Sequence, residues 1–392
     1  VGLVVAGELA RGGAGLRVAV LEGGPGPVPI SEASAAPTPD VRTYALSPGS
    51  VRTLRRLGAW ELMQDRTRPF LDMQVWDEGG PGLLQFSASS VGTANLGVIA
   101  ENATLQSALW HVLAGEEDVT LVTNAAIRGV GEGAVHLGDG KLTARLIVGA
   151  DGGNSIVRRS AGIPTWGWGY GQEAVVATVK LDTDSYTAWQ RYLPTGPVAL
   201  LPLWQSMASV VWSTTPAHAR ALREMEPEAF IKELNANMSQ PPRPLTDEVD
   251  RTVASAPRPL RWAVHEVLRT AEAAVAGATL LQPFNSPPEA TELLSSRLAF
   301  PLRFEHARSY VAPGVALVGD AAHSLHPMAG QGLNLGMADA SALARRLLSA
   351  TGGGQSVADG EALRGYHGER RRRNLLVMGA LDVLHRVYGA GG

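Results

Sequence analysis

The chain has 392 residues, a formal net charge of −3 and 45% hydrophobic residues. This apolar content suffices for a large core in one or two domains, and the slight acidity argues against nucleic-acid binding. The absence of cysteine excludes disulfides, thiolate metal sites and thiol chemistry. No apolar run approaches the roughly 18 residues of a membrane span, and no targeting segment is recognisable.

The amino-terminal residues predict a helix followed by a buried strand. Gly2 to Ala10 is small and apolar, glycines follow it, and Leu16 to Leu21 is a run typical of a parallel sheet. In a Rossmann unit an acidic residue at the end of the second strand binds the adenosine ribose, about 20 residues beyond the glycine fingerprint. Glu22 stands at that distance from Gly2, which would be the last glycine of the fingerprint. The alternative is an ordinary helix–strand pair that ends in a surface glutamate.

The next segment predicts a loop over residues 25–39 and then a capped helix. Ser47 is a plausible N-cap with Pro48 at the first helical position, and the helix should run to Leu57. Further elements are strands over 73–76 and 83–86, a helix over 101–113, strands over 119–122 and 135–137, and a return strand over 142–148. Arg42 before the capped helix and Gln106 on the later helix are either solvated or functional.

A glycine-rich connection follows the return strand. The sequence LIVGADGGNSIVRR (146–159) indicates a strand that ends at Gly149 and a helix that begins near Ser155. Glycines permit a close backbone approach, and Asp151 beside Gly152 can bind a hydroxyl group or cap helix amides.

Residues 172–213 alternate as four strands and predict an antiparallel sheet with one apolar face, suited to covering a hydrophobic substrate. A sheet packed on its own core is the alternative. Residues 216–240 predict a helical stretch, 241–259 a loop, and 258–290 a possible insertion. The basic run 370–373 with Asn374 lies on a carboxyl-terminal helix, and we expect a solvated face there; a membrane or partner contact is the alternative.

The most informative stretch is residues 312–336, APGVALVGDAAHSLHPMAGQGLNLG. A buried strand over 315–318 ends at Gly319 and Asp320, which places one carboxylate at the carboxyl end of a strand, where open α/β sheets bind ligands. The glycine turn at 330–332 opens a second helix, whose free N–H groups favour an anionic or electron-rich group. A hydroxyl-binding aspartate and an anion-binding helix start, joined by a short segment, suit a nucleotide cofactor.

These motifs together resemble the fingerprints of the aromatic-ring hydroxylases, the FAD monooxygenases of the para-hydroxybenzoate hydroxylase type. The resemblance implies an α/β fold in which a Rossmann-like FAD-binding domain is interleaved with an antiparallel-sheet substrate domain, followed by carboxyl-terminal helices. It implies that Asp320 holds the ribityl chain and that the helix start at 330–334 faces the pyrimidine end of the isoalloxazine, since reduced flavin carries negative charge there. The cofactor-binding residues implied are Gly2, Glu22, Arg42, Gln106, Asp151, Gly152, Gly319, Asp320, Gly330, Gln331, Gly332, Leu333 and Asn334.

The same resemblance implies a domain layout. FAD-binding parts are expected at 1–72, 99–165 and 301–345, substrate-domain parts at 73–98 and 166–300, and a helical segment at 346–392. In the family, the first strand and the first two glycines of the fingerprint precede the position of Gly2. We therefore expect the chain to be trimmed at both ends, and we expect the absence of that strand and glycine loop to weaken its binding of FAD.

Segments such as 72–77, 188–194, 196–203, 211–214, 300–302 and 366–388 resemble more closely the ubiquinone-biosynthesis hydroxylases of mitochondria and bacteria. That resemblance implies hydroxylation of the ring of a polyprenylated phenol by O2 through a flavin C4a-hydroperoxide. It also implies a peripheral location on the matrix side of the mitochondrial inner membrane. Its implied partners are a ferredoxin system or NAD(P)H as electron donor, other ubiquinone-biosynthesis proteins and the membrane surface.

Because the flavin carries the chemistry, no acid–base residue is singled out. His326 and Pro327 are candidates for the border of the reaction cavity, and no metal site is expected because His323 and His326 are poorly spaced as ligands. Arg191, Leu200, Pro202 and Trp212 are candidates for the substrate side. Two alternatives stay open: an NAD(P)H-dependent flavin hydroxylase of another phenol, and a non-catalytic prenyl-lipid-binding protein of the same fold.

Overall fold

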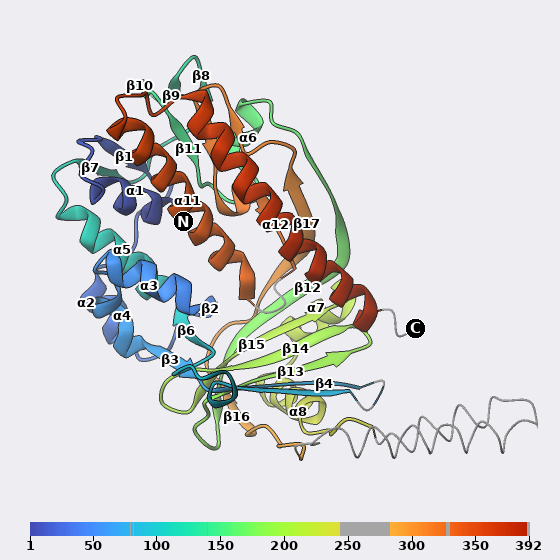
Figure 1. Cartoon of the computed structure of the whole chain (residues 1–392). Coiled ribbons are helices and arrows are strands. Elements are labelled where there is room, and N and C mark those ends of the chain that lie inside the picture. Colours follow the sequence, from blue (N-terminus) through green and yellow to red (C-terminus); the bar gives the residue numbers. More distant parts are fainter. Residues whose placement is uncertain (79, 81, 139, 244–282, 327–329, 390–392) are drawn as a thin grey trace, which may run out of the picture. The chain divides into compact units, whose positions relative to one another are not determined.

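The structure is a computed structural model that describes residues 1–78, 80, 82–138, 140–243, 283–326 and 330–389. The chain divides into two compact units (Figure 1). Unit 1 holds residues 1–68, 97–172 and 301–383, and unit 2 holds residues 69–96, 173–300 and 384–392. The chain therefore passes from one unit to the other several times, as an interleaved fold requires. The predicted insertion lies largely outside the described residues, and no helix among the described residues is long and apolar enough to cross a membrane.

Unit 1 contains parallel strand pairs flanked by helices, which makes it an α/β unit. Strand β1 (Val18–Leu21) pairs with β7 (Val119–Val122), and β11 (Ile147–Gly149) pairs with β19 (Val315–Leu317). The other strands of this unit are β2 (Thr43–Leu46), β6 (Gly97–Glu101), β8 (Gly129–Gly131), β9 (Ala134–His136), β10 (Lys141–Thr143), β18 (Val311–Ala312) and β20 (His323–Ser324). The predicted return strand over 142–148 is wrong in one respect, because it is two strands, β10 and β11, in different sheets.

The helices of unit 1 bury small and aliphatic side chains in one core. They are α1 (Gly2–Ala10), α2 (Ile30–Ala35), α3 (Pro48–Arg56), α4 (Trp60–Met63), α5 (Asn102–Ala114), α6 (Ile156–Ser160), α11 (Gln331–Gly352) and α12 (Gly360–Gly389). Val4, Leu54, Leu317 and Leu343 are fully buried and join α1, α3, β19 and α11. The long helices α11 and α12 run beside one another in Figure 1.

Two local predictions of this unit have clear outcomes. The Ser47 hydroxyl accepts a hydrogen bond from the Ser50 amide, and Gly58 follows the end of α3 with a φ of 67°, so the capped helix is confirmed. The loop expected over 25–39 is wrong in part, because α2 forms within it. Pro29 stands immediately before α2, and the small residues that follow it permit a short helix.

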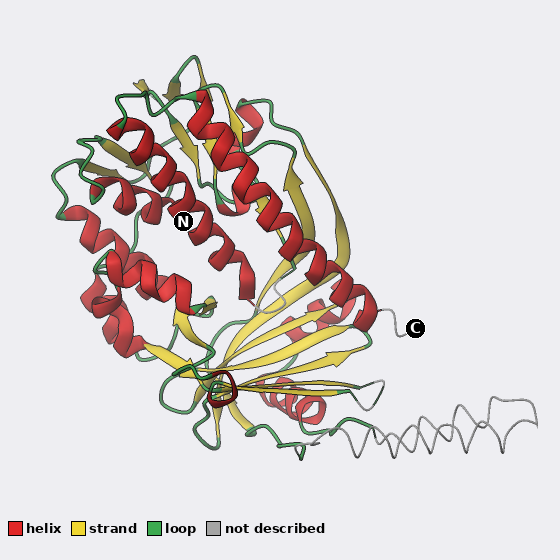
Figure 2. Ribbon diagram, in the orientation of Figure 1, coloured by secondary structure: helices red, strands yellow, loops and turns green. Residues whose placement is uncertain are grey.

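Unit 2 is built on a mainly antiparallel sheet with the order β12, β15, β14, β13, β4, β5 (Figure 2). Its strands are β12 (Thr165–Leu181), β13 (Thr187–Leu193), β14 (Gly196–Pro202), β15 (Met207–Thr214), β4 (Asp72–Asp77), β5 (Leu83–Ser87) and β16 (Ala290–Leu293). Strands β3 (Thr67–Phe70), β12 and β17 (Leu298–Ala307) contribute residues to both units. The four strands predicted over 172–213 are confirmed, and only the pairing of β13 with β4 is parallel in this set.

One face of this sheet is covered by helices of its own unit. Helices α7 (Pro216–Glu224) and α8 (Pro227–Met238) bury Leu222, Phe230 and Leu234 against every second residue of the strands, such as Val210 and Trp212. The predicted helical stretch over 216–240 is thus two helices. The apolar face therefore forms a core, which corrects the expectation that it covers a substrate.

We expect Trp212→Ala to lower the free energy of unfolding by about 3–5 kcal/mol, because the indole is fully buried against α7 and α8. Leu84→Ala, on β5 of the same sheet, removes a half-exposed side chain and should cost far less. Urea unfolding followed by circular dichroism measures both values. Similar values for the two variants would contradict this packing.

Candidate FAD site

The three sequence motifs meet in unit 1. A Cβ placed on Gly2 would lie 3.2 Å from the Cβ of Ala150, and one placed on Gly336 would lie 3.2 Å from the Cα of Gly319. The start of α1, the end of β11 and the first turns of α11 therefore approach one another through glycines. Because β11 and β19 are parallel, both motifs that follow them lie at the same edge of the sheet.

Asp320 lies at this edge, in the short 3-10 turn Gly319–Ala321 that follows β19. Its side chain is exposed, yet burial by surrounding protein raises the pKa of its carboxyl, against the opposing effect of His323 and the terminal amine. An exposed carboxylate at the end of a strand can accept hydrogen bonds from ligand hydroxyl groups.

A side chain on α6 connects the two motifs. The Arg158 guanidinium is buried and donates to the carbonyl oxygens of Ala321 at 2.9 Å and Gly153 at 2.7 Å. It also pairs with Glu305 at 3.0 Å. The loop after β11 and the turn that carries Asp320 are therefore held at a fixed separation.

Helix α11 begins at Gly330, whose φ of 59° is left-handed. A Cβ there would lie 3.0 Å from the Cβ of Ala45, so the position favours glycine for two reasons. Glycine supplies no side-chain oxygen to cap the first amides, in contrast to Ser47 at the start of α3. The positive end of a 22-residue helix is thus suited to an electron-rich ligand.

Asn334 fixes this helix start to the strand β2. Its side-chain amide donates to the carbonyl oxygens of Ala45 at 2.7 Å and Gly330 at 3.0 Å. Its oxygen accepts hydrogen bonds from the Ser47 amide at 2.8 Å and the Ser50 hydroxyl at 2.7 Å. These contacts make Asn334 a residue that positions the helix start, while Leu333 packs against the core.

Asp151 caps a helix in this structure. Its carboxylate accepts hydrogen bonds from the Ser155 hydroxyl at 2.5 Å and from the amides of Ile156 and Val157, at the start of α6. The sequence left two roles open for Asp151, the binding of a ligand hydroxyl group and the capping of helix amides. The structure shows the capping role. Beside it, Gly152 has a φ of 78° and open space where a Cβ would stand, which leaves room for a ligand.

Tyr44 is a site residue that sequence reasoning missed. Burial raises the pKa of its hydroxyl; Arg42 lowers that pKa, whereas Asp320 and Asp40 raise it. Tyr44 lies on β2 immediately before Ala45, the residue that packs against Gly330 at the start of α11. The only sequence signal was its place between Arg42 and the cap at Ser47.

Other predicted residues occupy the surface of unit 1. Gln106 is exposed on α5, and the exposed Arg42 lies 4.0 Å from Asp40. Glu22 follows β1, and its carboxylate accepts a hydrogen bond from the Gly24 amide at 2.9 Å. No contact in the structure joins Glu22 or Gln106 to Asp320, and their cofactor roles stay predictions. Gln331 and Gly332 lie in the first turn of α11.

A buried polar cluster lies directly behind Asp320. Asp339 of α11 contacts the Nε2 atom of His323 at 2.5 Å, the Nε atom of Arg370 at 2.7 Å and the amide of Asn374 at 3.0 Å. The expectation of a solvated face is therefore wrong for Arg370 and Asn374, which are 4% and 0% exposed. The reason is that α12 turns these two side chains inward toward a buried carboxylate, which the spacing of the basic run did not reveal.

The four predicted substrate residues lie on the helix-covered face of the unit 2 sheet. Leu200, Pro202 and Trp212 are buried, and the Arg191 guanidinium donates to Asn237 and Gln240. Burial lowers the pKa of Arg191. This placement argues against direct substrate contact, because α7 and α8 occupy that face.

The two histidines of the third motif differ in their contacts: His323 meets the Asp339 carboxylate, and His326 packs against an aromatic ring. His326 is 1% exposed and meets the ring of Tyr170 edge-on at 5.1 Å between centroids. Its neighbour Pro327 lies outside the described residues. Among the described residues, no cluster of three or more His, Asp or Glu side chains could hold a metal ion.

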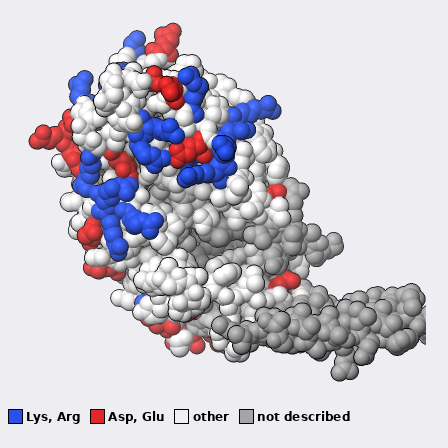
Figure 3. Space-filling view, viewed as in Figure 1, with Lys and Arg blue, Asp and Glu red and all other residues white. Residues whose placement is uncertain are grey.

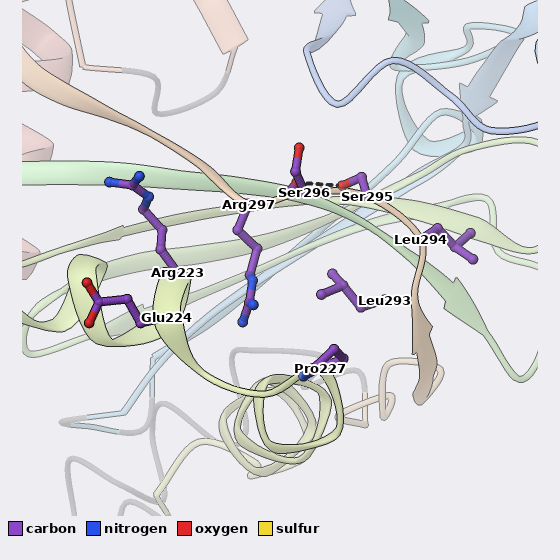
Figure 4. Close-up of a pocket in the computed structure, with 8 residues that line it drawn as sticks. All are labelled: Arg223, Glu224, Pro227, Leu293, Leu294, Ser295, Ser296 and Arg297. Atoms are coloured by element: carbon purple, nitrogen blue, oxygen red, sulfur yellow. Dashed lines mark hydrogen bonds between the residues drawn. The ribbon is translucent and has the colours of Figure 1, made fainter.

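Unit 2 also carries a surface pocket of about 550 Å³ between α7, α8 and the segment 293–297 (Figure 4). Two of its polar side chains are engaged within the protein: Arg297 donates to the carbonyl of Leu222 at 2.7 Å, and Ser295 donates to the carbonyl of Ser296 at 2.8 Å. None of its lining residues belongs to the sequence motifs. The pocket therefore offers no chemistry for the predicted reaction.

Comparisons with known proteins identify the family of the chain. The family model described as FAD binding domain matches residues 1–254 and 272–379. The chain is 37% identical to the mitochondrial ubiquinone biosynthesis monooxygenase COQ6 of Homo sapiens, over 95% of this chain and 79% of that protein. It is 35% identical to the COQ6 protein of Schizosaccharomyces pombe, over 85% of this chain and 71% of that one.

Among solved structures, PqsL, a probable FAD-dependent monooxygenase from Pseudomonas aeruginosa, has the same fold, with a TM-score of 0.70 and 24% identity over 99% of this chain and 95% of that chain. The chain therefore belongs to the FAD-dependent aromatic monooxygenases. Its curated relatives within that family are COQ6 proteins, so the predicted resemblance, fold class, enzyme class and FAD cofactor are confirmed.

The residues present fit FAD. The exposed Asp320 carboxylate can accept hydrogen bonds from ribityl hydroxyl groups, the start of α11 can face the electron-rich flavin edge, and the open space at Gly152 admits a ligand close to the backbone.

The buried His306 predicts a pH dependence of stability. Burial lowers its pKa to about 4, with smaller contributions from the charges of His323, Arg371 and His367. Its pKa is lower in the folded state than the ordinary 6.5, so its contribution is complete above pH 6.5 and is lost as pH falls toward 4. Between pH 7.5 and 5 we expect His306→Gln to lose about 2 kcal/mol less unfolding free energy than the wild type.

The control is His136→Gln, which removes an exposed histidine from β9. Between pH 7.5 and 5 this variant should lose as much unfolding free energy as the wild type does. Equal losses in all three proteins, measured by urea unfolding, would contradict a neutral buried His306.

Proposed function

We propose that this protein is an FAD-dependent monooxygenase that hydroxylates the aromatic ring of a polyprenylated phenol in ubiquinone biosynthesis. The observation that supports this most is the close approach of the turn that carries Asp320 to the first turns of α11, whose start is held by Asn334. The named function of the COQ6 relatives supports the substrate class.

When bound, FAD supplies the oxygen-activating chemistry by the route that the sequence resemblance implies. The protein's part is to bind, orient and stabilise. Asp320 accepts the hydroxyl groups of the ribityl chain, and the amides of the first turn of α11 stabilise negative charge on the reduced ring. Asn334 keeps that helix end in place, so the amides need not reorganise during the reaction.

The face of the unit 2 sheet opposite α7 and α8 is the better candidate for the substrate side. Strand register turns Gln190, Tyr192, Leu201 and Val211 to that face, because each is one residue from a side chain of the helix-covered core. Its mixture of aromatic, apolar and amide groups suits a substituted phenol with an apolar chain. The resemblance supports a ferredoxin system or NAD(P)H as electron donor and a peripheral location on the matrix side of the inner membrane, with other ubiquinone-biosynthesis proteins as partners.

The test of the cofactor site is Asp320→Ala. We expect the dissociation constant for FAD, measured by quenching of flavin fluorescence, to rise by about tenfold or more, since a charge-assisted hydrogen bond is removed. The matched control is Asp65→Ala, an exposed aspartate after α4, which should leave the constant unchanged.

The test of the substrate class is product analysis with the FAD-loaded protein, O2 and an electron donor. A polyprenylated phenol should give the hydroxylated product, identified by mass spectrometry, at a higher rate than a simple phenol. Turnover of the simple phenol alone would favour a different flavin hydroxylase. Binding of the prenyl lipid with no product and no FAD would favour a lipid carrier.

A further inference from the structure

Three polar side chains of α12 form a buried stripe, one helical turn apart. Tyr366, Arg370 and Asn374 follow the spacing i, i+4 and i+8, so they lie on one face of the helix. They are 0%, 4% and 0% exposed. Arg372 and Arg373 of the same basic run are exposed, and Figure 3 shows Lys and Arg side chains gathered on the surface over α11 and α12. The stripe is thus distinct from the solvated part of the run.

The stripe contacts the strand and helix on either side of Asp320. The Tyr366 hydroxyl donates to the carbonyl oxygen of Leu317, in the last residue of β19, at 2.7 Å. Arg370 and Asn374 both donate to the Oδ1 atom of Asp339, at 2.7 and 3.0 Å. Arg370 also donates to the side-chain oxygen of Asn374 at 2.8 Å, which ties the two together.

Asp339 connects these side chains of α12 to the turn that carries Asp320. Its Oδ2 atom accepts a hydrogen bond from the Gly319 amide at 3.1 Å and contacts His323 at 2.5 Å. Gly319 has a φ of 59°, which glycine adopts without strain, so the turn leaves its amide free to donate to Asp339. The carboxylate therefore holds the turn from both ends, at residues 319 and 323, with Asp320 between them.

The buried carboxylate depends on its cation. Asp339 is 0% exposed; burial alone would raise its pKa, but His323 and Arg370 outweigh burial and lower it. A buried carboxylate without Arg370 would have to take up a proton or draw in water, and either change weakens its bond to the Gly319 amide.

We propose that the stripe is a positioning device: Arg370 and Asn374, through Asp339, and Tyr366, through the Leu317 carbonyl, hold Asp320 in the orientation that FAD requires. This inference rests on the proposed cofactor role of Asp320. It assigns α12 a function in cofactor binding, although none of the three side chains need touch the cofactor.

The test compares Arg370→Gln with two matched variants of α12. Arg372→Gln removes an exposed arginine from the same run, and Leu363→Ala removes a buried apolar side chain that offers no hydrogen bond to Asp339. Amide hydrogen exchange of the segment 317–323 is measured without FAD, and the FAD dissociation constant is measured by fluorescence. Leu363→Ala shows how much either readout responds to a loss of stability alone.

We expect Arg370→Gln to raise the exchange rate of the 317–323 amides and to weaken FAD binding by about tenfold. Arg372→Gln should match the wild type, and Leu363→Ala should lower the melting temperature with less than about a twofold change in FAD binding. Arg370→Lys should recover most of the affinity, because it restores the cation that Asp339 needs but not the planar fork.

Unchanged exchange at 317–323 in Arg370→Gln, or a change no larger than in Leu363→Ala, would overturn the inference. Faster exchange in a protein whose wild type binds no FAD would leave the positioning role standing and refute the proposed function instead. Faster exchange with unchanged FAD affinity would show that Asp320 does not need this support, and would also overturn the inference.

Discussion

The structure of the cofactor-binding unit depends on one buried carboxylate. Asp339 receives four donors: Arg370 and Asn374 on one oxygen, and His323 and the Gly319 amide on the other. Each oxygen has two donors, and the Arg370 cation with these hydrogen bonds offsets the cost of removing the charge from water. Since these donors come from α12, the segment after β19 and the turn before Asp320, one residue orders three parts of the chain.

Asp320 of the third motif and Asp339, which follows that motif on α11, illustrate how the environment gives identical groups different roles. Asp339 has its charge fully compensated, so its pKa is lowered and it can only hold structure. Asp320, 19 residues earlier, is exposed but poorly hydrated, and its pKa is raised. A carboxylate that is not satisfied by the protein is available to a ligand, and this contrast is the physical basis for the assignment of Asp320 to the cofactor.

The sequence predicts correctly those features that depend on residues close together in the chain. The cap at Ser47, the strand before Asp320 and the helix opened by Gly330 follow from residue types at short spacing, and the structure has all three. The partners of Arg370 and Asn374 lie more than 30 residues away on α11, and nothing in a basic run distinguishes an arginine that faces a buried carboxylate from one that faces water. The amphipathic pattern of unit 2 likewise predicted strands but not what covers each face.

That ambiguity has a specific consequence for the substrate side. A strand alternates with a period of two, so the choice of Arg191, Leu200, Pro202 and Trp212 selected one face consistently, and that face belongs to α7 and α8. Shifting each choice by one residue moves it to the other face without changing the strand assignment. An apolar stripe long enough to bind a prenyl chain is also an apolar stripe that two amphipathic helices can bury. Only the tertiary contacts of Phe230 and Leu234 decide between these uses, and they decide for the core.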